Sequence, residues 1–264
     1  MKFALIGNGA IAQYVKSNLS ARGHTVEALL LRADGAASEP QPDDKAPLVL
    51  YRVADLPGDV VHVIDCAGHA GLRDYGSDIL VSGRNLTTVS IGALADEELY
   101  SALRKAVVKG RSTLHLASGA IGALDCLRAA RVGQLTSVCY TGRKPSAGWL
   151  GSPAESKLCL QALKGTPQTH FQGSARQAAI EYPKNANVAA AVALAGIGFD
   201  KTTVELIADP GITSNIHEIQ AEGEFGSFEF RISGKALADN PRSSALAAMS
   251  VISSIEQQTG TIVF

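Results

Sequence analysis

Three polar residues stand directly before a run of small apolar residues, and their types could bind an anion. Lys184, Asn185 and Asn187 precede the run from Val188 to Gly196, which is built almost only of Ala, Val and Leu. Pro183 cannot continue a helix that begins near Gly173, and Asn185 is expected to cap the next one. A helix without a polar face is buried, so its N-terminal N–H groups would attract an anion. The alternative is an ordinary capped turn with a solvent-facing lysine.

His217 is the histidine best placed for acid–base chemistry. The chain has six histidines, and they form no H-x-x-x-H pair and no Cys/His cluster with zinc spacing, so no metal site is expected. His217 lies between apolar Ile216 and Ile219, just after a Pro-Gly turn. A neutral imidazole there could act as a general base. The alternative is a polar side chain on the exposed face of an edge strand.

Two further cations, Arg143 and Lys144, follow a predicted strand in a basic loop that contains the only tryptophan. Together with Lys184 they are the candidates for holding a substrate carboxylate, Arg as a bidentate partner and Lys as a point charge. The chain shows no nucleophile elbow, no phosphate-binding P-loop and no cluster of metal-binding carboxylates. We therefore expect hydride transfer, in which a bound cofactor carries the chemistry and the protein positions the substrate.

The N-terminus carries the G-x-G-x-x-A form of the dinucleotide fingerprint in the context that it requires. A short apolar strand, 3–6, is followed by a glycine turn and by a helix that continues to about Ala21. The first glycine permits the turn, the second lets backbone approach a pyrophosphate, and Ala12 allows close packing of helix and strand. The alternative is a glycine-rich turn without a ligand. The expected cofactor contacts are Gly7, Gly9, Ala10 and Ile11.

Arg32 stands where NAD-selective sites usually place an acidic residue. The second strand is expected over 25–31, and Asp34 comes only two residues after Arg32. Arg32 could accommodate a 2′-phosphate, so the cofactor is predicted as NAD or NADP. The alternative is that Arg32 is a solvated residue of the loop 33–47.

Alternating strands and helices predict a doubly wound parallel sheet. Three buried strands, near 60–68, 86–92 and 113–117, are separated by helices near 70–83 and 96–109. Ligands of such sheets bind outside the carboxyl ends of the strands. Small residues occur at these ends, at 67–68, 91–93 and 118–120, and leave room for a flat ring. Ala67 is expected to contact the cofactor.

Beyond residue 121 the pattern changes to mixed α and β. A helix over 121–131, strands near 136–141 and 202–208, and a hairpin of 215–222 with 225–232 are expected. A final helix should start at Asn240-Pro241, with a last strand at 261–264. The fold is therefore predicted as α/β, a Rossmann-type doubly wound parallel sheet with a second α+β domain inserted before the C-terminal helix. The expected domains are 1–112 plus 237–264 for the dinucleotide, and 113–236 for substrate and oligomerisation.

Composition bounds the class of protein. The chain has 264 residues, 46% hydrophobic content and a formal net charge of -1, which gives no indication of nucleic acid or a membrane surface as a partner. No apolar run approaches the ~18–20 residues that span a bilayer. The four cysteines are widely separated and form no C-x-x-C pair, and no signal peptide is evident. We expect a cytoplasmic protein with reduced thiols.

Several stretches resemble the L-aspartate dehydrogenase family, and the similarity runs over nearly the whole chain in the expected order. The most specific stretch is Tyr182-Pro-Lys-Asn-Ala-Asn-Val188, far more so than the glycine turn. That stretch lies within 181–188, and the others are the N-terminal G-x-G-x-x-A and residues 90–96, 118–125, 140–145, 215–219 and 240–244.

The resemblance implies NAD(P)-dependent interconversion of L-aspartate and iminoaspartate. Iminoaspartate then either hydrolyses to oxaloacetate and ammonia or feeds NAD biosynthesis. The family's active-site histidine falls on His217, and its cofactor contacts fall on Ala120 and Asn187. The absence of an acidic residue at the end of the second strand departs from the pattern of NAD-selective sites.

Two other functions remain open at this point. One is a related two-domain oxidoreductase, of the homoserine dehydrogenase or dihydrodipicolinate reductase type. The other is a non-catalytic protein that senses NAD(P), against which the retained histidine and the cations at 143, 144 and 184 argue. A homodimer is expected, because the open sheet of the second domain has a face that something must cover.

Overall fold

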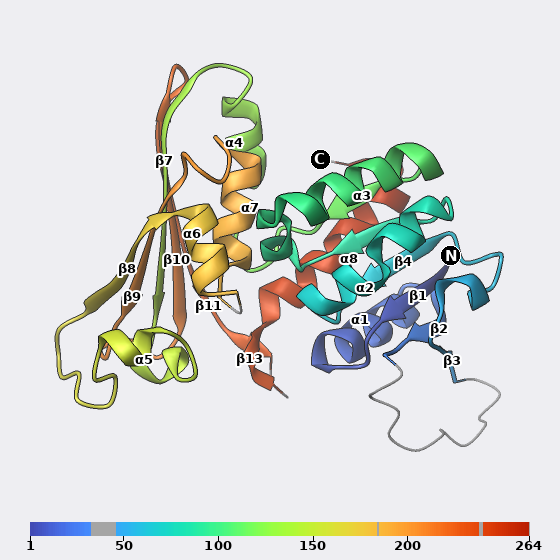
Figure 1. Cartoon of the computed structure of the whole chain (residues 1–264), viewed down its shortest axis with the longest axis horizontal. Coiled ribbons are helices and arrows are strands. Elements are labelled where there is room, and N and C mark those ends of the chain that lie inside the picture. Colours follow the sequence, from blue (N-terminus) through green and yellow to red (C-terminus); the bar gives the residue numbers. More distant parts are fainter. Residues whose placement is uncertain (33–45, 184, 238–239, 264) are drawn as a thin grey trace. The chain divides into compact units, whose positions relative to one another are not determined.

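The chain folds into two compact units in the computed structural model, which describes residues 1–32, 46–183, 185–237 and 240–263 (Figure 1). Unit 1 comprises Met1–Ala117 with Ala248–Phe264, and unit 2 comprises Ser118–Ala247. The expected boundaries at 112/113 and 236/237 are therefore displaced. Residues 114–116 pair into the sheet of unit 1, and residues 240–244 pair with 236–237 in unit 2.

Unit 1 contains a six-stranded parallel sheet in the order β3-β2-β1-β4-β5-β6. This order is that of dinucleotide-binding folds. Strands β2 and β3 are added on one side of β1 and strands β4 to β6 on the other, so the strand order reverses between β1 and β4 while all strands stay parallel. The predicted Rossmann-type sheet is confirmed, although the short edge strand β3 was not expected from the sequence. The strands are β1 Lys2–Ile6, β2 Thr25–Leu30, β3 Leu48–Leu50, β4 His62–Asp65, β5 Asn85–Thr88 and β6 Leu114–Leu116.

Helices cover both faces of this sheet. Phe3 and Leu5 of β1 pack in one core with α1 (Ala10–Ala21) and α8 (Ala245–Thr259). Ile6 points the other way and faces α2 (His69–Val81), against which α3 (Glu97–Gly110) packs. Successive residues of a strand point to opposite faces, so β1 anchors both helix layers. Two 3₁₀ turns, Val53–Asp55 and Ile91–Ala95, complete the unit.

Unit 2 contains a five-stranded mixed sheet in the order β11-β10-β7-β9-β8. β7 and β9 are parallel, and the other neighbours are antiparallel, including the predicted hairpin of β10 and β11. The strands are β7 Leu135–Lys144, β8 Gln168–Ser174, β9 Thr203–Ala208, β10 Asn215–Gly223 and β11 Gly226–Gly234. A separate two-stranded ribbon joins β12 (Ala236–Leu237) and β13 (Asn240–Ser244).

One face of this sheet carries helices. The helices α4 (Leu124–Ala130), α6 (Ala175–Glu181) and α7 (Asn187–Ala195) lie along it (Figure 1), with a short helix α5 (Ala154–Lys157) and a 3₁₀ turn (Ser146–Trp149) nearby in the sequence. α7 is buried along almost its whole length, as predicted. The opposite face is hydrophilic: Gln220 bonds Glu229, Glu218 pairs with Arg231, and Glu205 accepts from Thr169.

Four local expectations were wrong, and so was the alternative that placed His217 on an exposed edge strand. Arg143 and Lys144 end strand β7 rather than occupying a loop, and β10 is a central strand, so His217 is not on an exposed edge. Asn185 does not cap α7, because its side chain is engaged by Lys144 instead. Residues 240–244 form β13, and the last helix begins only at Ala245. No strand forms at 261–263.

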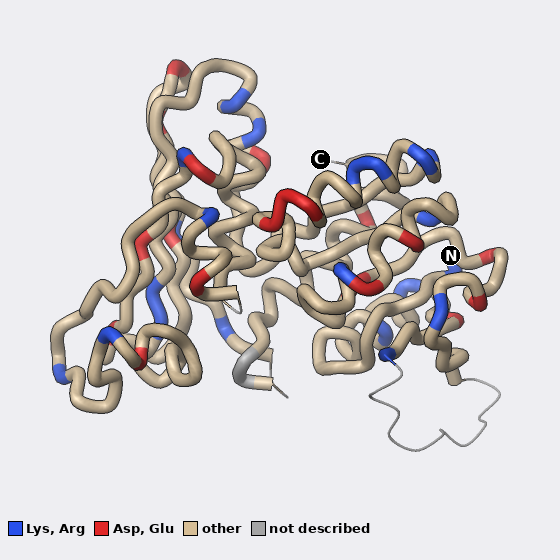
Figure 2. Tube along the Cα trace, viewed as in Figure 1, with Lys and Arg blue, Asp and Glu red and all other residues tan. Residues whose placement is uncertain are grey.

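Acidic and basic residues are interspersed over both units (Figure 2). In the described residues, no helix is both long and apolar enough to cross a membrane.

Candidate active site

The glycine turn of unit 1 lies where the strand order reverses. Gly7 follows β1 with a φ of 89°, and its N–H donates to the carbonyl of Leu30 at 2.9 Å. A Cβ added to Gly7 would lie 3.0 Å from the Cβ of Ala67, so glycine is needed both for the turn and for the close approach to the end of β4. Two residues predicted to contact the cofactor, Gly7 and Ala67, therefore meet at the switch point.

The N-terminus of α1 is open to an anion. Gly9 is the capping residue, no side chain caps the helix, and the first turn contains no acidic residue. A Cβ added to Gly9 would meet nothing within 4 Å, so there is free space above it. The partly buried Ala10 and Ile11 begin the helix, and the N–H groups of a first turn have no partner within the helix itself. This arrangement suits a pyrophosphate.

Arg32 is exposed two residues beyond the carboxyl end of β2. The neighbouring Leu31 carbonyl accepts a hydrogen bond of 2.8 Å from the hydroxyl of Tyr75 on α2, which fixes the chain as it leaves the strand. Asp34 and most of the loop expected over 33–47 lie outside the described residues.

Asp65, at the end of β4, lies beside the glycine turn and was not among the residues predicted from the sequence. Its carboxylate is buried and accepts hydrogen bonds from the hydroxyls of Thr88 (2.7 Å) and Ser90 (2.6 Å) and from the backbone N–H of Ala67 (2.9 Å). Burial raises the pKa of this carboxyl. The network joins the ends of β4 and β5 and holds the Ala67 turn in place. An aspartate at the end of a buried apolar strand was the feature of the sequence that could have indicated it.

His217 of β10 lies in the interior of unit 2, on the face that carries the helices. Its side chain is 6% exposed, and its Nδ1 lies 2.8 Å from the hydroxyl of Tyr140 on β7. Burial, with a smaller contribution from the charge of Lys144, lowers the pKa of His217 to about 4. The ring is therefore neutral at pH 7.

Lys144 shares this face of the sheet. On β7, Tyr140, Gly142 and Lys144 alternate to the same side, and Gly142 is the register partner of His217. The Lys144 ammonium bonds the side-chain oxygen of Asn185 and lies 4.9 Å from the ring centroid of Trp149. Burial lowers the pKa of Lys144 to about 8.

Arg143 has a different environment from Lys144. Adjacent residues of a strand point to opposite faces, and Arg143 forms an ion pair of 3.1 Å with the buried Asp209. The structure thus brings Lys144 together with His217 but turns Arg143 away from them. Lys184, the third predicted cation, lies outside the described residues.

The two remaining predicted contacts lie on the same side of the unit 2 sheet. Asn187 is the first residue of α7. Just before the helix, Asn185 contacts Lys144, and just after it, Gly196 lies close to Val138. α7 therefore runs along β7 with its N-terminus toward Lys144. Ala120 lies in the turn between β6 and α4, and the neighbouring Gly122 packs against the ring of Phe230. Phe230 pairs with Ile219, two residues from His217 on β10.

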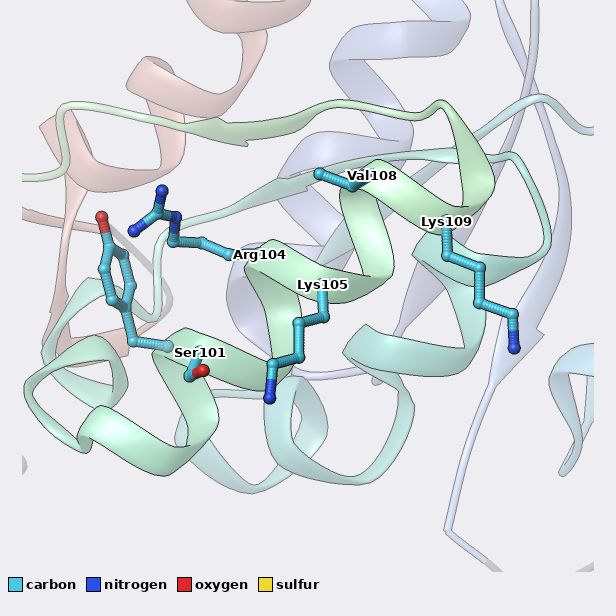
Figure 3. Close-up of a pocket in the computed structure, with 6 residues that line it drawn as sticks. Ser101, Arg104, Lys105, Val108 and Lys109 are labelled. Carbon is cyan, nitrogen blue, oxygen red and sulfur yellow. The ribbon is translucent and has the colours of Figure 1, made fainter.

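Other features of the described residues add no second site. No group of three or more His, Cys, Asp or Glu side chains could hold a metal ion. A hollow of about 510 Å³ lies on α3, where Arg104 extends toward the ring of Tyr100 and the lysines reach outward (Figure 3). It is lined by Tyr100, Ser101, Arg104, Lys105, Val108 and Lys109, none of which belongs to the predicted site.

A Rossmann sheet with an uncapped glycine turn, followed by a mixed-sheet unit that buries a histidine beside a lysine, defines an NAD(P)-dependent oxidoreductase. Residues 7–117 match the model of the homoserine dehydrogenase NAD-binding domain, and residues 125–258 match that of the aspartate dehydrogenase C-terminal domain. The chain belongs to the aspartate dehydrogenase family.

Similar proteins agree with this assignment. An L-aspartate dehydrogenase of Ruegeria pomeroyi is 50% identical over 99% of this chain and 94% of its own length. One of Ralstonia nicotianae is 44% identical over 94% of each chain. The crystal structure of aspartate dehydrogenase from Thermotoga maritima superimposes with a TM-score of 0.78 at 26% identity, covering 100% of this chain and 99% of that one.

Proposed function

We propose that this chain oxidises L-aspartate to iminoaspartate with NAD or NADP, and that it catalyses the reverse reductive amination of oxaloacetate. The observation that carries the proposal is the neighbourhood of His217 and Lys144 on one face of the unit 2 sheet, next to the N-terminus of α7. Membership of the aspartate dehydrogenase family supports the choice of substrate.

The nucleotide is expected on the glycine turn of unit 1. When bound, its nicotinamide accepts or supplies the hydride. Gly9, Ala10 and Ile11 present the backbone N–H groups of α1 to a pyrophosphate, and Gly7 and Ala67 leave the switch point open. In unit 2, Ala120 and Asn187 are proposed to contact the cofactor, as the family resemblance implies. The exposed Arg32 at the end of β2 supports acceptance of a 2′-phosphate.

The substrate is proposed to bind through its carboxylates. Lys144 is a partly buried cation that faces the same side as His217, which suits an acidic substrate. Arg143 already pairs with Asp209, and Lys184 lies outside the described residues. Of the two predicted cations that the structure describes, we therefore assign Lys144 to a substrate carboxylate. His217 is proposed as the catalytic residue that contacts the reacting part of the substrate. The iminoaspartate formed either hydrolyses to oxaloacetate and ammonia or enters NAD biosynthesis.

Spectrophotometric assay of the full chain tests this proposal. With L-aspartate and NAD⁺ or NADP⁺, reduced cofactor should accumulate. With oxaloacetate, ammonia and NAD(P)H it should be consumed. A chain that oxidises L-homoserine but not L-aspartate would contradict the proposal, and one that binds NAD(P)H without turnover would be a sensor.

Replacement of His217 tests its role in that reaction. His217→Ala should lower kcat by about 10²–10⁴-fold while leaving cofactor affinity, measured by NAD(P)H fluorescence, nearly intact. Near-normal turnover of this variant would rule out a catalytic role for His217.

We also propose a homodimer. Among the described residues, α4, α6 and α7 lie along one face of the unit 2 sheet and none of them covers the polar face, and a twofold dimer is the commonest assembly of soluble proteins. Light scattering on the purified protein should give twice the chain mass of 27.5 kDa. A mass of one chain at assay concentrations would exclude the dimer.

A further inference from the structure

The hydrogen bond between Tyr140 and His217 decides which imidazole nitrogen is free. Tyr140 Oη lies 2.8 Å from Nδ1 of His217, and the two rings are inclined by only 19°. Among the described residues, no partner is evident for Nε2. Nδ1 is thus occupied by the protein, and Nε2 is the nitrogen left for a substrate.

The direction of this hydrogen bond follows from the burial of Tyr140. Its side chain is 1% exposed, and burial raises the pKa of the phenol, so the hydroxyl keeps its proton. A buried O–H group without an acceptor costs about 1–3 kcal/mol. Nδ1 is the acceptor in reach, so the hydroxyl donates to it. The single proton of a neutral imidazole must then sit on Nε2.

The surroundings keep the ring neutral. Lys144 is the charged group that faces His217 from β7, and its positive charge disfavours a second one on the imidazole. On β11 the register partner is the apolar Ile232, and α7, which packs on β7, contains no titratable side chain. Glu218 and Arg231 pair with each other on the opposite face of the sheet.

We infer that Tyr140 is a positioning residue that holds His217 as the Nε2–H tautomer, so that His217 meets its substrate as a neutral hydrogen-bond donor. The inference rests on the proposed function and replaces the general-base role expected from the sequence. The group recognised is the oxygen of an α-keto acid or of its ammonia adduct, on which negative charge develops during carbon–nitrogen bond formation. A neutral imidazole of lowered pKa is suited to polarise such an oxygen.

Gly142 makes this arrangement possible. It lies opposite His217 in the register of β7 and β10, and Tyr140 precedes it by two residues on the same face. A Cβ added to Gly142 would lie 2.7 Å from Tyr140 Oη and 3.2 Å from its Cζ. The tyrosine ring therefore lies over Gly142 and fills the space that a Cβ would need. Any side chain at residue 142 would displace the Tyr140 hydroxyl from His217.

Nitrogen NMR of the ¹⁵N-histidine-labelled full chain tests the tautomer directly. The His217 signals, assigned by their loss in His217→Gln, should show a protonated Nε2 and an unprotonated Nδ1 from pH 6 to 8. In Tyr140→Phe the neutral ring loses a donor, so the tautomers should mix and the pKa of His217 should rise by about one pH unit. A proton on Nδ1 in the wild type, or an unchanged or lowered pKa in Tyr140→Phe, would overturn the inference.

Tyr182 offers a matched control. Its hydroxyl lies 3.1 Å from Nδ1 of buried His170, so unit 2 contains a second tyrosine–histidine pair. Tyr182→Phe removes the same kind of hydrogen bond and should alter the His170 signals while leaving the His217 titration unchanged. A change at His217 in both variants would indicate a general loss of packing and would count against a specific role of Tyr140.

Kinetics separate a donor from a base. The amide nitrogen of glutamine can stand in for Nε2–H but accepts no proton, so His217→Gln should retain about tenfold more kcat than His217→Ala. Equal loss in both variants would contradict donation by His217. If the NMR tautomer is as stated but neither variant lowers kcat, the proposed catalytic role of His217 fails while the positioning by Tyr140 stands.

Discussion

Lys144 has a charge that its surroundings set. The ammonium lies between the ring of Trp149 and the amide oxygen of Asn185, and burial brings the pKa of Lys144 down to about 8. Its charge is therefore present at neutral pH and is lost as the pH rises through about 8. An acidic substrate that depends on this charge should bind less well above that pH.

Lys144→Met should accordingly raise the KM for L-aspartate by about tenfold to a hundredfold, because a hydrogen bond to a charged group contributes roughly 1.5–3 kcal/mol. In the wild type, kcat/KM for aspartate should fall above pH 8. This decrease should be absent from the pH profile of the variant. Steady-state kinetics between pH 6.5 and 9.5 measure both effects.

Lys157 provides the control for this experiment. It also lies over aromatic rings, those of Phe171 and Tyr182, but it is exposed and pairs with Glu181. Lys157→Met should leave the KM and its pH dependence unchanged. If Lys144→Met behaves like Lys157→Met, Lys144 does not bind the substrate.

The turn from β1 into α1 contains two glycines with different tasks. Gly7 has a φ of 89° and lies against Ala67, whereas Gly9 has a φ of -79° and open space beside it. Gly7 is thus required by the fold, and Gly9 is required only by a ligand that approaches the backbone. Substitutions at the two glycines of this turn should therefore affect different properties, stability at Gly7 and cofactor binding at Gly9.

Alanine at each position tests this separation. Gly7→Ala should lower the free energy of unfolding by about 1–2 kcal/mol or more, because a left-handed residue and a close contact are both strained. Gly9→Ala should unfold like the wild type but bind NAD(P)H about tenfold more weakly, through loss of a backbone contact to the pyrophosphate. Denaturant titration and cofactor fluorescence measure the two effects. Full affinity in Gly9→Ala would argue against a pyrophosphate at this turn.

Buried neutral histidines make the stability of the whole chain depend on pH. Burial lowers the pKa of His62, His170 and His217 to about 4 in each case, with smaller contributions from His115 for His62 and from nearby lysines for the other two. In the unfolded chain they titrate near 6.5. Between these values the unfolded state binds more protons, so stability is complete above about pH 6.5 and is lost as the pH falls toward 4.

Denaturant midpoints should therefore fall between pH 7 and pH 4.5. His62 is one source of the effect, since its Nε2 bonds the hydroxyl of Thr87 at 2.8 Å inside the unit 1 sheet. His62→Gln should make the decline shallower, because one buried titrating group is gone, although its stability at pH 7 is lower. The same slope in this variant as in the wild type would exclude His62 as a source.

The sequence by itself determined the features whose signals are local. The glycine turn, the alternation of strands and helices and the buried α7 follow from residue spacing within short windows, and Pro183 predicts the end of α6. The same local signals carried the family resemblance. Boundaries were less well predicted, since β7 extends through Lys144 and β13 replaces the start of the last helix.

Only the tertiary structure decided which side chains meet. The register of β7 and β10 sets His217 opposite Gly142 and within reach of Tyr140, residues about 75 positions away in the sequence. Strand alternation turns Lys144 toward the histidine and Arg143 toward Asp209. Burial then sets the protonation of Lys144 and His217, because desolvation depends on everything packed around a group. Pairing and burial depend on residues far apart in the sequence, so residue types alone left a general base and three candidate cations. In the described residues, the fold gives a neutral imidazole beside the partly buried Lys144.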